Sequence, residues 1–275
     1  MKKIVLDTVS PLHKTGHTSK GDQRKWKIED TWCKADYMGY ESLSEVMVSA
    51  LLERSSLSYP FVSYQHVRIE YKGNMINGCS SRDFLQQDQI LIPVEKLYRQ
   101  YTGESLAVKL SEFQDVSEKI QYLVEEMEEI THIEDFGKYI TAILEIDAFF
   151  LNEDRHTNNI AVIYNEKTGQ YSLSPIFDQG LCLFSDTSYD YPIDLSVEKC
   201  MEKIEAKPFH SDFDVQLETA EELYGNQIEF MFTIKDVQEI LNQFERSYSD
   251  KIRERVESLL HTQIRKYAYL MRSPQ

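Results

Sequence analysis

The chain has 275 residues, of which 41% are hydrophobic and 28% are charged, so it can bury a sizeable core and is not mainly disordered. Its formal net charge of −16 argues against direct nucleic-acid binding, because proteins that bind duplexes normally carry a basic surplus. The most apolar helical stretch, residues 140–151, contains Glu145 and Asp147, and no signal peptide is visible. We therefore expect no membrane attachment and, with four scattered cysteines and no CxxC pair, a cytoplasmic location.

The first part of the chain mixes strand and helix patterns. Apolar residues with helical spacing predict a helix over residues 43–54, with Ser42 as its N-cap and Glu45 at the capping-box position. Residues 60–71 are rich in Val, Tyr and Phe and predict strands, and 72–74 predict a turn. The pattern becomes helical after residue 110, so we predict an N-terminal lobe over residues 1–105 and a C-terminal lobe over 106–275.

The second part is predicted to be mainly helical around one hairpin. Helices are expected over residues 120–130, 135–151, 234–248 and 250–272. Between them, the polar stretch 152–159 is followed by a strand at 160–164, a turn at 165–170 and a strand at 171–177. The fold class predicted is therefore α+β, with two packed lobes, a small sheet-containing N-lobe and a mainly helical C-lobe.

The hairpin carries residues of the types that phosphoryl transfer from ATP requires: a carboxylate for the attacking hydroxyl and oxygen ligands for Mg²⁺. Asp154 is followed five positions later by Asn159, which is the offset of the catalytic Asp and Asn in protein kinases. Asp178 follows the second strand, and the outer ends of an antiparallel hairpin are neighbours. We therefore expect Asn159 and Asp178 to share a metal ion while Asp154 faces the nucleophile; the neighbouring Asn158 is the alternative to Asn159.

A glycine-containing segment near the N-terminus is a candidate phosphate loop. Residues 13–34 carry six basic and three acidic residues, a local charge of +3 in an acidic protein. Gly16 and Gly21 flank a stretch that contains Thr18 and Ser19, and such a loop can direct backbone N–H groups at phosphates. The segment does not match the Walker pattern, and an ordinary surface turn is the alternative.

Two stretches resemble a known family. LNEDRHTNNIAVI (151–163) and IFDQGLCLFSD (176–186) resemble the HipA-like serine/threonine kinases, including the CtkA-type bacterial kinases. The DRHxxN core is also similar to the phosphatidylinositol 3-/4-kinase-like group. The resemblance is clearest over residues 135–185 and looser over 14–55 and 206–216, and it implies a two-lobed protein-kinase-like fold with ATP in the cleft.

The resemblance also implies a role for each matching residue. Asp154 resembles the catalytic aspartate, with Arg155 and His156 completing the loop, and Asn159 and Asp178 resemble the two metal-binding positions. Gln179 stands where the DFG motif of ordinary protein kinases has its aromatic residue.

The lysine and glutamate of the N-lobe are assigned in the same way. Lys34 resembles the ATP-contacting lysine and Glu45 its helix partner, with Lys27 and Glu41 as the alternatives. The 15–26 segment resembles the phosphate-covering loop of the family, in which a serine can itself be phosphorylated. Ser19, and after it Thr18, is the expected site.

The function implied is an ATP- and Mg²⁺-dependent kinase that phosphorylates a Ser or Thr hydroxyl of a protein, with autophosphorylation. Relatives of this kind include toxins of toxin–antitoxin pairs, so a cognate antitoxin is a candidate partner. Two alternatives stay open: a small-molecule or lipid-headgroup kinase, suggested by the DRHxxN similarity, and a nucleotide-binding regulatory pseudokinase.

Overall fold

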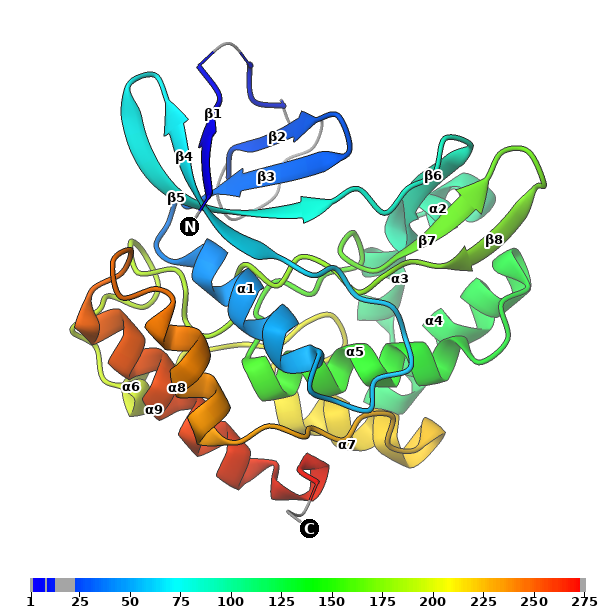
Figure 1. Cartoon of the computed structure of the whole chain (residues 1–275). Helices are drawn as coiled ribbons and strands as arrows, with labels where there is room; N and C mark the ends of the chain where they lie inside the picture. Colours follow the sequence, from blue (N-terminus) through cyan, green and yellow to red (C-terminus); the bar gives the residue numbers. More distant parts are fainter. Residues whose placement is uncertain (1, 8, 13–22, 273–275) are drawn as a thin grey trace.

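A five-stranded sheet forms the N-terminal part of the structure, a computed structural model that describes residues 2–7, 9–12 and 23–272 (Figure 1). Its strands lie in the order β1-β4-β5-β3-β2, with β1 parallel to β4 and the other neighbours antiparallel. They are β1 (Lys2–Val5), β2 (Lys25–Ile28), β3 (Thr31–Ala35), β4 (Gln65–Tyr71) and β5 (Asn74–Arg82). Of the predicted strand region 60–71, only residues 65–71 form a regular strand.

Residue alternation along β2 and β3 gives this sheet two different faces. Trp26 pairs with Cys33, and both pack with Val67 in a small hydrophobic cluster on one face. Lys25 and Lys34 are also a cross-strand pair, and each is the sequence neighbour of a buried residue. Their side chains therefore lie on the opposite face, because successive side chains of a strand point to opposite sides.

Helix α1 (Glu41–Leu52) is buried along nearly its whole length. It packs against β3, β4 and β5 on one side and against the C-terminal helix α8 (Ile234–Asn242) on the other. The predicted N-cap is wrong, because the helix begins at Glu41 and its N-cap residue is Tyr40, not Ser42. The Glu41 carboxylate accepts hydrogen bonds from the backbone N–H groups of Met38 (2.6 Å) and Gly39 (3.0 Å), which fixes the turn before the helix.

The chain then continues through β6 (Gln89–Pro93), α2 (Val94–Thr102), α3 (Leu106–Glu112), α4 (Val116–Thr131) and α5 (Phe136–Phe150). Helices α4 and α5 correspond to the predicted helices 120–130 and 135–151. The Asp115 carboxylate accepts a hydrogen bond from the backbone N–H of Ser117 at 2.7 Å and so caps α4. Every residue of α5 except Lys138 is buried, which makes it the central helix of the C-terminal part.

A second, three-stranded sheet contains the predicted hairpin. Its order is β6-β7-β8, with β7 (Ala161–Asn165) and β8 (Gln170–Leu173) forming the hairpin. The second strand is shorter than the predicted 171–177, because residues 175 and 176 leave the sheet and the backbone of Ile176 bonds to Pro60 and Val62 instead. The sequence did not predict β6. This strand lies within the predicted N-terminal lobe, residues 1–105, but it pairs with β7 of the predicted C-terminal lobe. The division into lobes at residues 105 and 106 stays a prediction.

The C-terminal quarter contains α6 (Val197–Met201), α7 (Phe213–Tyr224), α8, α9 (Asp250–Lys266) and a 3₁₀ turn at Ala268–Leu270. Helices α8 and α9 end earlier than the predicted 248 and 272, and α7 was not predicted. Asp212 is the N-cap of α7, and its carboxylate accepts a hydrogen bond from the backbone N–H of Asp214 at 2.8 Å. It packs along α5.

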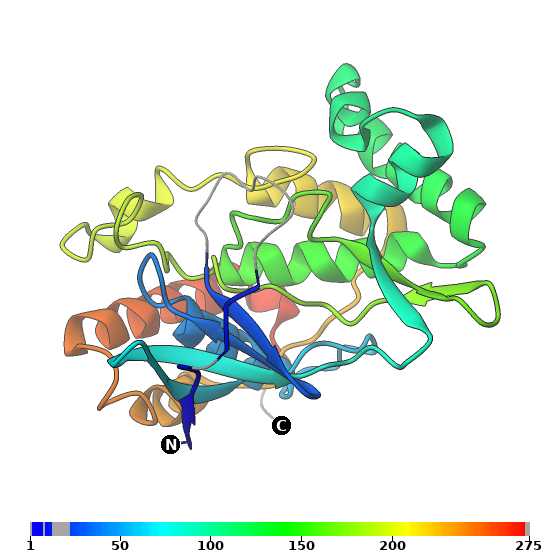
Figure 2. The ribbon, with the colours of Figure 1, turned by 90° about the horizontal axis from the view of Figure 1, so that it is seen from above.

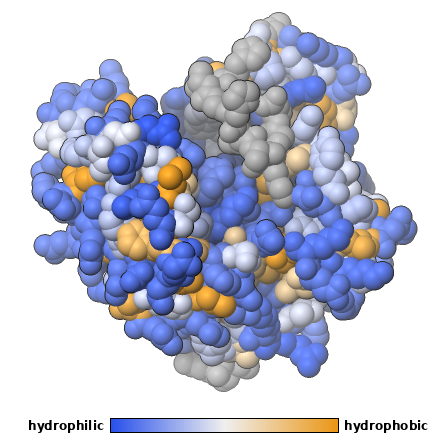
Figure 3. All heavy atoms as spheres, turned by 180° about the vertical axis from the view of Figure 1, so that it is seen from behind, coloured by the Kyte–Doolittle hydropathy of each residue, from blue (hydrophilic) through white to orange (hydrophobic). Residues whose placement is uncertain are grey.

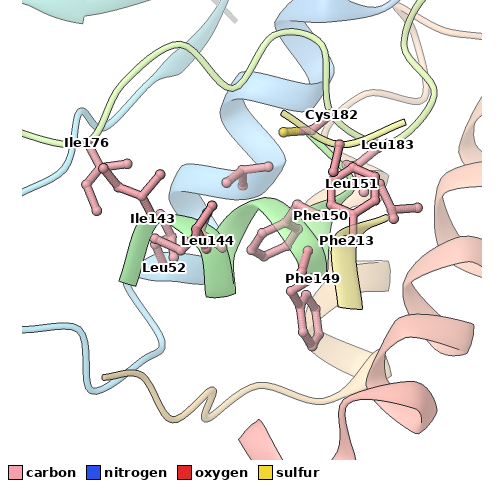
Figure 4. Packing of buried hydrophobic residues seen from close by; sticks show 14 of the residues in the cluster. Leu52, Ile143, Leu144, Phe149, Phe150, Leu151, Ile176, Cys182, Leu183 and Phe213 are labelled. Atoms are coloured by element: carbon pink, nitrogen blue, oxygen red, sulfur yellow. The ribbon is translucent and has the colours of Figure 1, made fainter. Parts of the chain in front are cut away.

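The main core joins the two parts of the molecule. Figure 4 shows Leu52 of α1 close to Ile143 and Leu144 of α5, with Ile176 beside them and Leu183 farther along α5. In the view from above, the five-stranded sheet lies below α5 in the picture, and α2 to α4 lie beyond the right-hand end of α5 (Figure 2). The face in Figure 3 is mostly hydrophilic, with hydrophobic atoms in small groups. Among the described residues, no helix combines the length and apolarity needed to cross a bilayer.

Candidate active site

A buried lysine holds two carboxylates together at the boundary between the two parts. The Lys34 ammonium on β3 forms an ion pair with Glu45 of α1 and a second one with Asp178 (Oδ1, 2.7 Å), which follows the hairpin. Glu45 is fully buried, and its other oxygen accepts a hydrogen bond from the backbone N–H of Gln179 at 2.9 Å. Lys34, Glu45 and Asp178, three of the residues singled out in the sequence, therefore meet in one place.

The charge of Lys34 is stabilised by this arrangement. Burial by itself lowers the pKa of the lysine, but Asp178 and Glu45 together raise it well above its ordinary value. The ammonium also lies 5.0 Å from the centre of the Tyr64 ring, within the range of a cation–π contact. Lys34 is thus a fixed positive charge in a place that solvent hardly reaches.

The two alternatives considered for this pair lie elsewhere. Lys27 forms an ion pair with Asp83 at 2.5 Å. Glu41 binds the backbone of the turn before α1. In the structure the lysine–glutamate pair is therefore Lys34 with Glu45.

A second lysine lies beside the first, and the sequence analysis did not single it out. The ammonium of Lys25 on β2 is 3.5 Å from Asp178 Oδ2, so both oxygens of that carboxylate face a lysine. Lys25 and Lys34 are direct cross-strand partners. Lys25 could have been found from the alternating pattern Lys25-Trp26-Lys27. In a strand with Trp26 buried, this pattern places both lysines on the opposite face.

The loop between α5 and β7 brings the other singled-out residues together. The Asn159 amide nitrogen donates a hydrogen bond to the backbone carbonyl of Asp154 (2.8 Å) and lies 3.5 Å from its Oδ2. His156 Nε2 and Lys207 Nζ are each 3.8 Å from Asp154 Oδ1. Asn158 is exposed, so it is Asn159 that lies against Asp154.

Arg155 lies inside the protein and connects this loop to the segment before Asp178. Its side chain is 1% exposed and forms a two-point ion pair with Asp147 of α5, at 2.8 and 3.0 Å. It also donates hydrogen bonds to the backbone carbonyls of Asn159 (2.9 Å) and Phe177 (3.0 Å). Because it does not reach the surface, Arg155 can act only by positioning the two ends of the hairpin.

The segment after Asp178 is bound to the turn before α1. The backbone carbonyl of Ser185 accepts a hydrogen bond from the Tyr40 N–H at 3.1 Å, and the Ser188 N–H donates to Met38 O at 2.9 Å. A Cβ atom added at Gly39 would lie only 2.1 Å from the Ser185 carbonyl oxygen. The close approach of these two chains therefore requires glycine at position 39.

A cavity of about 310 Å³ is lined in part by Lys207, whose ammonium is 3.8 Å from Asp154 Oδ1. Its wall includes Glu153, the sequence neighbour of Asp154, whose Oε2 accepts a hydrogen bond from the Tyr191 hydroxyl at 2.7 Å. The lining residues are Glu153, Tyr189, Asp190, Tyr191, Lys203, Glu205 and Lys207. The cavity is therefore polar, with one strongly exposed aromatic side chain, Tyr189.

The donor set fits a magnesium ion that is shared with a phosphate group. Asp178 offers carboxylate oxygens, and Asn159 keeps a carboxamide oxygen while its nitrogen binds Asp154. Within the described ranges no group of three or more His, Cys, Asp or Glu side chains is placed to hold a metal. Phosphate oxygens and water would have to complete the octahedral shell, as is usual for Mg²⁺ at nucleotide sites.

The residues predicted to form the phosphate loop, Gly16, Thr18, Ser19 and Gly21, lie outside the residues that the structure describes.

No protein-family model matches the chain, and no curated protein matches it in sequence. Among solved structures, the crystal structure of the Helicobacter pylori proinflammatory kinase CtkA is similar to it, with a TM-score of 0.62 and 14% identity over 96% of this chain and 94% of that one. HipA of Shewanella oneidensis, in a toxin–antitoxin complex with HipB and operator DNA, has a TM-score of 0.42 and 10% identity over 96% and 66%. The chain therefore has the fold of the kinase CtkA, which confirms the predicted α+β class with a sheet-containing N-terminal part and a helical C-terminal part.

Proposed function

We propose that the chain is a kinase that transfers the γ-phosphoryl group of ATP to a Ser or Thr hydroxyl of a protein, with Mg²⁺ as cofactor. The observation that carries the proposal is the position of Lys34, held by Glu45 against Asp178 at the boundary of the two parts. Phosphoryl transfer needs charge neutralisation and positioning more than covalent chemistry by the protein. The fold shared with CtkA supports the same assignment.

The nucleotide would lie with its phosphates between β2–β3 and Asp178. Lys34 and Lys25 face the same carboxylate, so their two charges can be directed at phosphate oxygens in the same place. When bound, Mg²⁺ would neutralise charge on the phosphates, with Asp178 and Asn159 as its protein ligands. Glu45 would keep Lys34 in position throughout, because it forms an ion pair with the ammonium and is itself bound to the backbone of Gln179.

Asp154 would orient the acceptor hydroxyl and accept its proton. Its carboxylate is close to the Lys207 and His156 side chains, and the Asn159 amide fixes the loop that carries it. The cavity next to Asp154 offers space for the residues around the acceptor hydroxyl. Arg155 and Asp147 would keep this loop rigid before substrate arrives, and such preorganisation is a main source of rate enhancement.

Ser19 is the proposed site of autophosphorylation, with Thr18 next, and a cognate antitoxin is the proposed partner; both depend on the sequence resemblance. The cytoplasmic location stays a prediction from the scattered cysteines and the absence of a visible signal peptide.

The direct test is intact-protein mass spectrometry after incubation with MgATP, with the wild type beside Asp154→Asn. Phosphate added to the wild type alone supports the kinase, and peptide mapping then tests Ser19. Asp88→Asn is a matched control, since Asp88 lies far from the site in an exposed ion pair with Lys167 at 2.9 Å, and it should be phosphorylated like the wild type.

The remaining outcomes separate the alternatives. Binding of MgATP without transfer to the chain itself or to any protein or small-molecule hydroxyl would favour a regulatory pseudokinase. Transfer to a lipid headgroup or small molecule, but not to protein, would replace the proposed acceptor class.

A further inference from the structure

A larger cavity lies at the end of the five-stranded sheet, away from the lysine site. It has a volume of about 520 Å³, within the range of small-molecule sites. The ends of β1, β3, β4 and β5 contribute to its wall, together with three connecting stretches: the one between α1 and β4, the one after β5, and the one after β8. The lining residues are Lys2, Thr31, Phe61, Val62, Ser63, Gln65, Ser80, Ser81, Arg82, Asp83, Phe84 and Pro175. We call it the strand-end cavity.

Most of the strand residues that line the strand-end cavity lie on the face of the sheet opposite Lys34. Ser80 of β5 pairs with Cys33 of β3, and Arg82 pairs with Thr31, so both share the face of the small hydrophobic cluster. Ser81, the partner of Trp32, lies on the other face. None of Lys34, Glu45 and Asp178 lines the cavity, so it is separate from the candidate nucleotide site.

The charge of this cavity has the opposite sign to that of the whole protein. Lys2 and Arg82 line it, and within the described part of the chain neither forms an ion pair with a carboxylate. The acidic lining residue, Asp83, is already neutralised by Lys27 at 2.5 Å. Two uncompensated positive charges thus face one cavity in a chain with a net charge of −16.

The uncharged lining indicates what kind of anion would fit. Hydroxyl and amide groups from Thr31, Ser80 and Gln65 can donate hydrogen bonds to phosphate or carboxylate oxygens, whereas the Ser63 hydroxyl already donates to Glu53 at 2.9 Å. The connecting segments add apolar walls from Phe61, Val62, Phe84 and Pro175. A flat apolar group can pack against those walls while its anionic group reaches the strand ends.

We propose that the strand-end cavity is a second binding site, for a small organic anion that carries a phosphate or carboxylate on a flat apolar group. The proposal does not depend on the chain being a kinase. The site adjoins the segment that leads to Asp178: Pro175 lines it, and the rings of Phe84 and Phe177 are 6.3 Å apart. A ligand there would contact the same segment that positions the candidate metal ligand.

Titration of isotope-labelled full-length protein with phenyl phosphate, followed by amide NMR at low ionic strength, tests the proposal. We expect saturable shifts centred on Thr31, Ser80 and Arg82, similar shifts with benzoate, and none with neutral benzyl alcohol. Arg82→Gln and Lys2→Gln should each weaken phenyl phosphate binding about tenfold, the usual effect of losing one charge-assisted contact. Both side chains are exposed, so the variants should keep the wild-type melting temperature.

Two controls decide where the probe binds. Arg246→Gln removes an exposed arginine elsewhere on the surface and should leave the affinity unchanged. Lys34→Met disrupts the candidate nucleotide site and should also leave it unchanged. Absence of saturable shifts, equal binding by Arg82→Gln and the wild type, or a loss of binding in Lys34→Met alone would each overturn the proposal.

Discussion

Arg155 and Asp147 form a fully buried two-point ion pair that joins the candidate catalytic loop to the central helix α5. Asn152 donates a further hydrogen bond to Asp147 Oδ1 at 3.0 Å. The remaining guanidinium nitrogen binds the carbonyls that precede and follow the hairpin. One side chain therefore sets the distance between the Asp154 loop and the segment that carries Asp178.

Replacing Asp147 by Asn should destabilise the protein strongly. The substitution leaves the Arg155 charge buried without a counter-ion, and breaking such a pair costs about 3–5 kcal/mol. Urea unfolding measures the change. Asp194→Asn removes one partner of the exposed ion pair with Lys251 and should have a far smaller effect. Equal effects of the two substitutions would show that Arg155 finds another partner.

Lys34→Met should reduce phosphoryl transfer by about 100-fold or more, the usual size of the effect when a group that stabilises transition-state charge is removed. The reason is the loss of the fixed charge beside Asp178. The rate of ³²P transfer at saturating MgATP measures it. Lys27→Met changes a neighbouring lysine that pairs with Asp83 instead, and it should retain most of the activity. The reverse ranking would assign the phosphate contact to Lys27.

Asp154→Asn and Asp178→Ala should both abolish transfer, but they should differ in nucleotide binding. In the proposed function Asp178 binds the metal, so its loss should strongly weaken the Mg²⁺-dependent part of ATP binding. Asp154 is proposed to contact the acceptor and not the nucleotide, so Asp154→Asn should bind MgATP nearly as the wild type does. Calorimetric titrations with and without Mg²⁺ compare them, and equal affinities for both variants would contradict the assignment.

Gly39→Ala should detach the segment after Asp178 from the turn before α1. The added methyl group would lie 2.1 Å from the Ser185 carbonyl oxygen, so one of the two chains must move. Hydrogen exchange should accelerate at residues 183–188, with little change in α9. Gly73→Ala is a useful comparison: it is strained by a φ of 74°, but its Cβ meets no atom, so exchange at 183–188 should not change. Unchanged exchange in Gly39→Ala would contradict the close contact.

The stability of the protein should fall as pH rises, partly because of Glu145. Burial raises the pKa of this carboxyl from 4.5 to about 8, so between those values the folded state holds a proton that the unfolded state has lost. The free energy of unfolding therefore decreases across this window and levels off above it. Glu145→Gln should make the decrease smaller in urea titrations from pH 5 to 8. The control Glu222→Gln, at an exposed position, should show the same decrease in unfolding free energy with pH as the wild type. If Glu145→Gln also showed the wild-type decrease, Glu145 would not contribute to it.

The hairpin and its neighbours could be predicted because their pattern is local. Helix α5 has continuous apolar spacing, β7 and β8 flank an evident turn, and the offset from Asp154 to Asn159 lies within one loop. Hairpin geometry predicted Asp178 near them, but β8 ends at Leu173, and it is Arg155 that binds the carbonyls of both Asn159 and Phe177. No comparable local signal existed for β6, whose five residues form a strand only because β7 is available to pair with them.

Glu45 shows where the helical pattern was insufficient. Its position on the helix wheel points away from the apolar stripe, which usually indicates an exposed side chain. In the structure α1 is buried on both sides, and a charged residue is tolerated there because Lys34 lies opposite. The pairing depends on a strand that ends six residues before the helix begins, and spacing alone does not specify it.

The amino-acid sequence by itself determined the fold class, the hairpin and the candidate residues of the catalytic loop, because periodicity and turn chemistry act over a few residues. Only the tertiary structure decided that Lys34 pairs with Glu45, that Lys25 also faces Asp178, and that Lys207 approaches Asp154. These pairs join segments far apart in the chain, and their energies depend on burial and distance, which arise only when the elements pack. The positive charge of the strand-end cavity also depends on the tertiary structure, because Lys2 and Arg82 come from different strands.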